Sequence, residues 1–127
     1  TFAGNLAADP ELRYTPSGQA VARLTVIENR RRKSADGASW EDAEPNVYRV
    51  QVWGGAGENV FESCGKGDRV VVSGRIVTDR WADKETGEAR TGQHVTADEV
   101  GFSLRYHTVR ATKATRTATG PDDTDEG

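Results

Sequence analysis

Alternation of apolar and polar side chains is the most regular pattern in the chain, and it is clearest between residues 70 and 81. Alternate residues of a strand point to opposite faces of a sheet, so this period of two predicts a β-strand. The predicted core face consists of Val70, Val72, Ile76 and Thr78. The other face carries Arg75 and Trp81. Gly74 interrupts the strand and indicates a bulge or a bend, which favours a small, curled barrel.

Three further stretches alternate in the same way. In residues 19–28 the predicted buried face consists of Ala20, Ala22, Leu24 and Val26. In residues 47–53 the predicted buried face consists of Tyr48, Val50 and Val52. The outer face of that strand carries Arg49 and Trp53, so it repeats the arrangement of residues 70–81. Residues 94–106 close the fold with an alternating set made of Val100, Phe102, Leu104 and Tyr106.

Two polar segments between these strands predict solvated hairpin arms. Residues 29–46 have their predicted tip at Asp36-Gly37, and residues 82–92 have theirs at Thr86-Gly87. Asp-Gly pairs between strands are a strong signal for a tight hairpin turn.

One short helix and one run of turns complete the folded part. About two helical turns are predicted between Glu58 and Cys64, with Gly65 as the glycine that ends the helix. Residues 7–18 contain Asp9-Pro10 and a Thr-Pro-Ser-Gly sequence, and they predict turns.

The order of these elements predicts an all-β fold. A first strand ends near Leu6, and the sequence then predicts strand, strand, short helix, strand, hairpin arm and strand. This order is typical of a five-stranded Greek-key barrel of the OB type. Residues 1–106 are predicted to form this domain. Residues 107–127 have too little apolar content to fold and predict a flexible acidic tail.

The net charge of the chain is unevenly distributed. The 127 residues have a formal charge of −3, but residues 1–119 hold 17 basic against 16 acidic side chains, and residues 120–127 hold four acids and no base. A phosphate-binding surface would therefore depend on local clusters of basic residues. No apolar run approaches the ~20 residues of a membrane span, and no signal peptide is visible, so a cytoplasmic protein is expected. The start at Thr1 without methionine suggests that a few N-terminal residues are absent.

The outer-face tryptophans and arginines allow two interpretations. Trp53 and Trp81, with Arg49 and Arg75, can form a stacking platform for nucleobases flanked by cations for phosphate. Alternatively, each ring packs under an arm or in a subunit contact.

The basic run at the start of the first arm also allows two interpretations. The run Arg30–Lys33 is either an ordinary solvated charge cluster or a clamp for a phosphate backbone, in which Arg30, Arg32 and Lys33 are the candidate DNA contacts. Trp40, further along the same arm, either stacks on a base or packs against protein.

Chemistry other than binding has little support in the sequence. Cys64 is the only cysteine, and it is a small buried residue, a reduced surface thiol or half of an intersubunit disulfide. No histidine is placed as its catalytic base, and one cysteine with two distant histidines cannot make a zinc site. The glycines at 54–57 predict a strand-to-helix turn, because no Gly-Lys-Ser/Thr follows them. We therefore expect no enzyme activity, no metal and no cofactor.

Several short motifs together resemble a known family, the bacterial single-stranded DNA-binding proteins. They are Gly4-Asn5-Leu6, the run from Asp9 to Gly18, Ala20-Val21-Ala22, Tyr48-Arg49-Val50, Lys66-Gly67, Val72-Ser73-Gly74-Arg75 and Arg80-Trp81. Residues 101–106 are similar to the actinobacterial branch, in which a C-terminal strand segment clamps neighbouring subunits. The resemblance implies a nucleoid-associated OB-fold homotetramer that wraps single-stranded DNA, without sequence preference, in replication, recombination, repair or chromosome segregation.

The resemblance also implies roles for individual residues. Trp53 and Trp81 would stack on bases and Arg49 would contact the strand. Phosphate contacts are implied near three basic residues: Arg13, Arg32 and Arg80. Tyr48 aligns with a position at a subunit contact.

Two departures from the family pattern affect these expectations. Val47 stands near a third stacking tryptophan of the family, and we hypothesise that Trp40 replaces it. The tail ends in Asp125-Glu126-Gly127 and not in the acidic Pro-Phe tip that recruits replication and repair proteins. The alternative to a DNA binder is an OB-fold interaction or assembly module that grips another protein.

Overall fold

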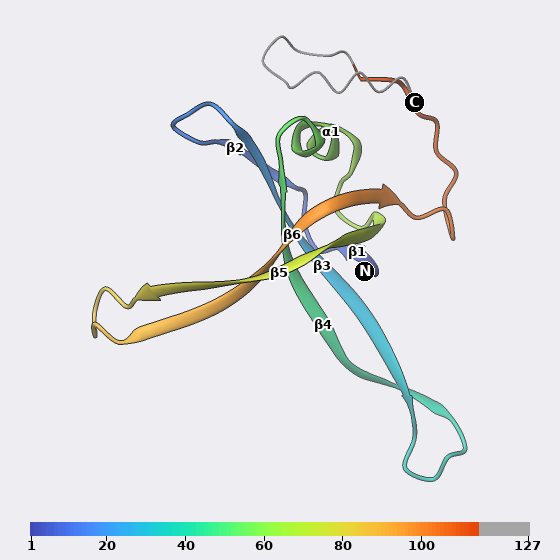
Figure 1. Ribbon diagram of the computed structural model, residues 1–127. Helices are drawn as coiled ribbons and strands as arrows, with labels where there is room; N and C mark the ends of the chain where they lie inside the picture. Colours follow the sequence, from blue (N-terminus) through green and yellow to red (C-terminus); the bar gives the residue numbers. More distant parts are fainter. Residues whose placement is uncertain (115–127) are drawn as a thin grey trace.

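The computed structural model describes residues 1–114, in which six strands and one helix are formed. Figure 1 shows strands that cross at the centre of the molecule and two long hairpins that project from it. The elements are β1 (Phe2–Leu6), β2 (Glu11–Tyr14), β3 (Ala20–Lys33), β4 (Trp40–Trp53), α1 (Gly55–Ser63), β5 (Arg69–Ala82) and β6 (Ala89–Phe102). The predicted acidic tail lies largely outside the described residues.

Five of the strands close into a barrel. β1 pairs antiparallel with β5 on one side and with β3 on the other, β5 pairs with β6, and β3 pairs with β4. The parallel pairing of β4 with β6 completes the ring. β2 is an extra strand that pairs with the start of β3. The predicted OB-type Greek-key barrel is therefore confirmed.

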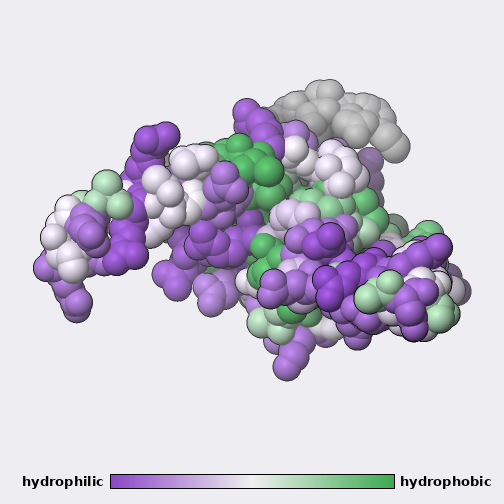
Figure 2. Space-filling model, turned by 90° about the horizontal axis from the view of Figure 1, so that it is seen from below, coloured by the Kyte–Doolittle hydropathy of each residue, from purple (hydrophilic) through white to green (hydrophobic). Residues whose placement is uncertain are grey.

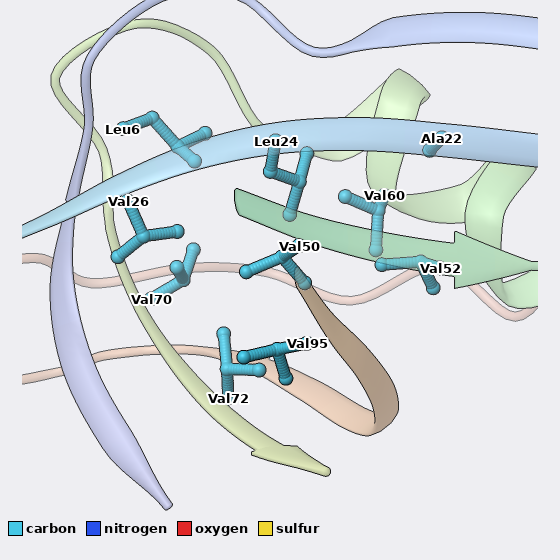
Figure 3. Close-up of a cluster of buried hydrophobic side chains, with 10 residues drawn as sticks. All are labelled: Leu6, Ala22, Leu24, Val26, Val50, Val52, Val60, Val70, Val72 and Val95. Carbon is cyan, nitrogen blue, oxygen red and sulfur yellow. The ribbon is translucent and has the colours of Figure 1, made fainter. Parts of the chain in front are cut away.

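Valine side chains dominate the core, and Figure 3 shows them converging from the barrel strands and from α1. The cluster consists of Leu6, Ala22, Leu24, Val26, Val50, Val52, Val60, Val70, Val72 and Val95. β-Branched side chains suit a pleated, half-buried surface, and burying one fully stabilises the fold by roughly 1.5–3 kcal/mol. The predicted core faces of residues 19–28 and 47–53 are confirmed, with Tyr48 partly buried against the cluster.

The second half of the predicted core face in β5 is wrong. Ile76 is 65% exposed and Thr78 is also exposed. The register between β5 and β6 shifts at Ser73/Gly74, where Asp98 of β6 is the extra residue, and beyond this bulge the two strands leave the barrel as an arm. A Cβ atom at Gly74 would meet the Thr96 carbonyl oxygen, so the close approach of the two backbones requires glycine at the bend.

Three other boundaries differ from the prediction. The predicted turn region 7–18 contains β2, which forms because its residues can pair with the start of β3. α1 spans Gly55–Ser63 and its C-cap is Cys64, whose backbone is extended, so Gly65 is not its left-handed cap. β6 ends at Phe102, and no strand follows in residues 103–114. Leu104 is accordingly 65% exposed.

Both predicted hairpin arms are present as continuations of barrel strands. Arm 1 is the outer part of β3–β4 (residues 28–46) and arm 2 is the outer part of β5–β6 (residues 77–94). Gly37 and Gly87 have positive φ angles of 72° and 74° at the two tips, as their predicted turn positions require. Figure 2 shows that the projecting parts are mostly hydrophilic.

Candidate nucleic-acid interface

The register of β3 and β4 defines an outer face opposite the core. Along β4, Arg49, Gln51 and Trp53 alternate with the buried Val50 and Val52. Their cross-strand partners on β3 are Thr25, Arg23 and Val21, in that order. Residues directly opposite in an antiparallel pair share a face, so the arginines and the ring of these strands lie on one surface.

The same face continues onto β6 and β5. Thr96 of β6 lies beside Gln51 in the parallel pair, and Arg75 of β5 lies opposite Thr96. Further along the hairpin, Trp81 lies opposite Arg90. Trp53, Trp81, Arg49 and Arg75 therefore share one outer surface, which we call the platform face.

Both tryptophans of the platform face are open to solvent. Trp53 is 39% exposed and Trp81 is 50% exposed. Neither ring belongs to the hydrophobic core cluster, so neither packs inside this chain. Arg49 and Arg75 form no ion pair with another described residue, which leaves their guanidinium groups available to an anion.

Trp81 and Arg49 meet above Gly92. A Cβ atom placed at Gly92 would lie 3.1 Å from Arg49 Nη2 and 3.2 Å from Trp81 Cη2. Arg49 Nη2 also donates to the Gln93 carbonyl oxygen at 3.0 Å. The absence of a side chain at Gly92 thus lets the ring and the guanidinium group lie side by side on β6, where a base and its phosphate could be bound together.

Comparisons with known proteins show the family of the chain. The model of the Single-strand binding protein family matches residues 1–103. The chain belongs to this family. The resemblance inferred from the sequence motifs is therefore confirmed.

Two relatives and one solved structure place the chain within the family. A single-stranded DNA-binding protein of Mycolicibacterium smegmatis is 47% identical over 116 residues, which cover 91% of this chain and 70% of that protein. One from Paenarthrobacter aurescens is 45% identical and is covered to 67%. The structure of a small single-stranded DNA-binding protein from Streptomyces coelicolor matches with a TM-score of 0.65 and 26% identity, over 80% of this chain and 90% of that chain.

Arm 1 of this family member divides its basic residues between two sides. Arg31 lies opposite Asp42 and Lys33 lies opposite Trp40, and both keep the alternation that begins with Arg23 on the platform face. The predicted clamp residues Arg30 and Arg32 lie on the other side, and Arg32 Nε is 3.1 Å from Glu41 Oε2. Of the three predicted arm residues, the register therefore places only Lys33 with the platform face.

Trp40 is 60% exposed, so it is not packed against the rest of the described chain.

Two predicted phosphate contacts outside arm 1 differ in position. Arg13 of β2 lies opposite Val21, on the side of Trp53, and it forms an exposed ion pair with Glu11 at 3.7 Å. Arg80 lies opposite Thr91, on the side of arm 2 that faces away from Trp81.

The sequence reasoning missed several residues of this surface. Arg23 already lies on the outer face of the alternation in residues 19–28, and Arg31 could have been found by carrying that alternation through the whole strand. His94 and Asp79 could not, because only the folded hairpin brings them to 2.7 Å from each other. Gln51, which is visible between Arg49 and Trp53, also belongs to the face.

The two predicted interface residues lie away from the platform face. Tyr48 stacks on Phe2 with ring centroids 3.8 Å apart, and burial together with the Glu28 carboxylate raises the pKa of Tyr48. Cys64 is a free thiol at the end of α1, and burial, followed by the nearby Asp68, raises the pKa of Cys64. Their roles between subunits stay predictions.

Two further findings concern the described residues as a whole. Between residues 1 and 114, no three His, Cys, Asp or Glu side chains gather closely enough to hold a metal ion. In that same part of the chain, no helix has the length and apolar character needed to cross a membrane.

Proposed function

We propose that this chain binds single-stranded DNA without sequence preference, through bases stacked on Trp53 and Trp81. The observation that carries the proposal is the exposure of both rings on one face together with Arg49 and Arg75. Every base has a flat aromatic face, so stacking works for any sequence and contributes about 1–3 kcal/mol per base. The relatives are named single-stranded DNA-binding proteins, which supports the same conclusion.

The basic residues of this face and of arm 1 would neutralise phosphates. Arg49 and Arg75 flank the rings, whereas Arg31 and Lys33 would extend the track along arm 1. Each contact with a single-stranded backbone releases counterions and adds roughly 0.7 to the slope of log affinity against log salt. Binding should therefore weaken steeply as salt rises. No bond is made or broken, so the protein acts as a binder and not as an enzyme.

We further propose that four copies assemble into a homotetramer that wraps the strand. Linked sites on one DNA molecule raise the effective concentration of each next contact. The exposed Ile76 and Leu104 of the single chain would be covered in such an assembly, where residues 101–106 could clamp a neighbour. The resemblance supports a role at the nucleoid in DNA replication, recombination, repair or chromosome segregation.

Titration with oligo-dT tests the proposal. Binding should quench the tryptophan fluorescence, and the affinity should fall as salt is raised. Saturating oligo-dT that leaves the emission unchanged at low salt would contradict it. The alternative is a module that binds only protein. It predicts aromatic rings that are buried without DNA, whereas Trp53 and Trp81 are exposed.

A further inference from the structure

The platform face contains a chain of hydrogen bonds beside the stacking rings. His94 Nδ1 lies 2.7 Å from Asp79 Oδ2, and Thr96 Oγ1 lies 3.2 Å from His94 Nε2. The His94 side chain is 11% exposed, whereas that of Asp79 is 46% exposed. An ionised carboxylate only accepts hydrogen bonds, so Nδ1 of His94 carries the hydrogen. The remaining nitrogen, Nε2, is the atom that can gain or lose a proton.

Thr96 can satisfy that nitrogen in either charge state of the ring. A hydroxyl group is both donor and acceptor, and its hydrogen rotates to suit its partner. When His94 is neutral, the Thr96 hydroxyl donates to Nε2. When His94 is protonated, Nε2–H donates to Thr96 Oγ1 instead. His94 can therefore change charge while both of its nitrogens stay hydrogen-bonded.

The negative charge of Asp79 is unfavourable on a surface that binds an anionic ligand. Asp79 and His94 line a hollow of about 380 Å³ together with Arg23, Arg49, Glu11 and Asp9, from β3, β4, β2 and the loop before β2. A phosphate held by the arginines of this hollow would be repelled by the Asp79 carboxylate. A proton on His94, directly bonded to that carboxylate, would cancel its charge. A bound phosphate would in turn favour the charged form of the imidazole.

On the basis of the proposed function, we propose that His94 is a further residue of the DNA interface and that DNA binding takes up a proton at His94. Imidazole is the side chain that ordinarily changes charge between pH 5 and 8. The affinity for single-stranded DNA therefore rises as the pH falls from 7.5 to 5.5. If the complex binds the proton ten times more tightly than the free protein does, Kd for DNA changes tenfold. The expected change in Kd over this pH range is about three- to tenfold.

The experiment measures Kd for a fluorescein-labelled oligo-dT by anisotropy from pH 5.5 to 7.5 at constant ionic strength. The chain contains two histidines, so His107→Gln is the matched control for His94→Gln. Wild type and His107→Gln should show the pH dependence. His94→Gln should bind with an affinity that no longer depends on pH between 5.5 and 7.5. Asp79→Asn, which keeps the acceptor and removes the charge, should bind several-fold more tightly at pH 7.5.

Calorimetry in two buffers of different protonation enthalpy reports the proton uptake of the unmodified protein directly, even if His94→Gln folds poorly. Uptake that persists in His107→Gln supports the proposal. A flat wild-type profile, an absence of uptake, or loss of the pH dependence in His107→Gln would overturn it while leaving DNA binding established. Absence of binding at every pH would instead contradict the proposed function itself.

Discussion

The two hairpin arms are built from strands of the same length, yet they hold their tryptophans differently. Each arm joins two 14-residue strands through a turn with a positive-φ glycine. In arm 2, Trp81 lies on Gly92 of the neighbouring strand, beside Arg49 of the barrel. In arm 1, Trp40 lies at the far end of its strand and is 60% exposed.

The difference begins where each arm leaves the barrel. Arm 1 has a register shift between Glu28 and Arg30, where Glu44 and Pro45 of β4 stand opposite one residue of β3. Proline lacks the N–H that a regular ladder needs, so it suits such a bulge. The register shift of β5–β6 lies at Ser73/Gly74, before arm 2 begins, and from Gly74 onward the two strands pair without a shift. A ring held on the sheet before DNA arrives loses less freedom on binding. The comparison assigns stacking to arm 2 and electrostatic attraction to arm 1.

The largest expected effect is that of Trp81→Ala. It should weaken binding to oligo-dT by about 1–3 kcal/mol, because the variant removes a stacking partner from a preorganised site. Trp40→Ala is the matched control and should have a clearly smaller effect. Labelled DNA followed by anisotropy makes the measurement independent of the removed fluorophore. Equal losses of affinity for the two variants would break the distinction between the arms.

Gly92→Val should come next in size. Its side chain would displace both Trp81 and Arg49. The loss of affinity should therefore approach the loss caused by Trp81→Ala but should not be larger than that loss. Gly101→Val, on the same strand, is the control, because a Cβ atom there has no neighbour within 4 Å. Thermal unfolding checks that both variants are folded. Unchanged affinity in folded Gly92→Val would show that the position of the ring is unimportant.

The two sides of arm 1 can be separated by salt dependence. Arg31→Ala with Lys33→Ala should reduce the slope of log Kd against log salt by about 0.7 for each phosphate that the variant no longer neutralises. Arg30→Ala with Arg32→Ala removes the same charge from the other side of the arm and should change the slope less. A larger change in the salt slope for Arg30→Ala with Arg32→Ala would show that the other side of arm 1 contacts the DNA.

The smallest effects should come from the turns. Hydrogen bonds from the Glu85 and Thr86 amides lower the pKa of Asp83 in arm 2, and a hydrogen bond from Ser34 lowers that of Asp36 in arm 1. A lowered pKa in the folded state means that the ionised form supports the turn at neutral pH. This support is lost as the pH falls below the ordinary range of aspartate. The protection factors of the amides of residues 85 and 86, which correct for the intrinsic pH dependence of exchange, should then fall, and protection factors that are unchanged by acid would contradict this.

Much of the barrel could be predicted because the cores of residues 19–28 and 47–53 alternate without interruption. The same alternation correctly put Trp53 and Arg49 on the outside. It failed at Ile76: Gly74 indicated a bulge or a bend, but the sequence of β5 does not show that the strand leaves the barrel there, and the extra residue of the bulge, Asp98, belongs to β6. The role of Gly92 was also hidden, since its neighbours Trp81 and Arg49 are 11 and 43 positions away in the sequence.

The arm residues show a second limit of the sequence. Four consecutive basic residues predict a charged arm, but only the strand register tells which side each one occupies. The sequence prediction includes Arg32 and omits Arg31, although Arg32 is paired with Glu41. The pairing of His94 with Asp79 likewise depends on a hairpin that brings together residues 15 positions apart.

The most direct test uses fluorine NMR of protein labelled with 5-fluorotryptophan. The chain has three tryptophans, so three signals are expected, each assigned by a Trp→Phe variant. Addition of oligo-dT should shift the signals of Trp53 and Trp81 strongly, and that of Trp40 less. If the signals of Trp53 and Trp81 stay in place while the DNA is bound, the platform face is not where the bases lie.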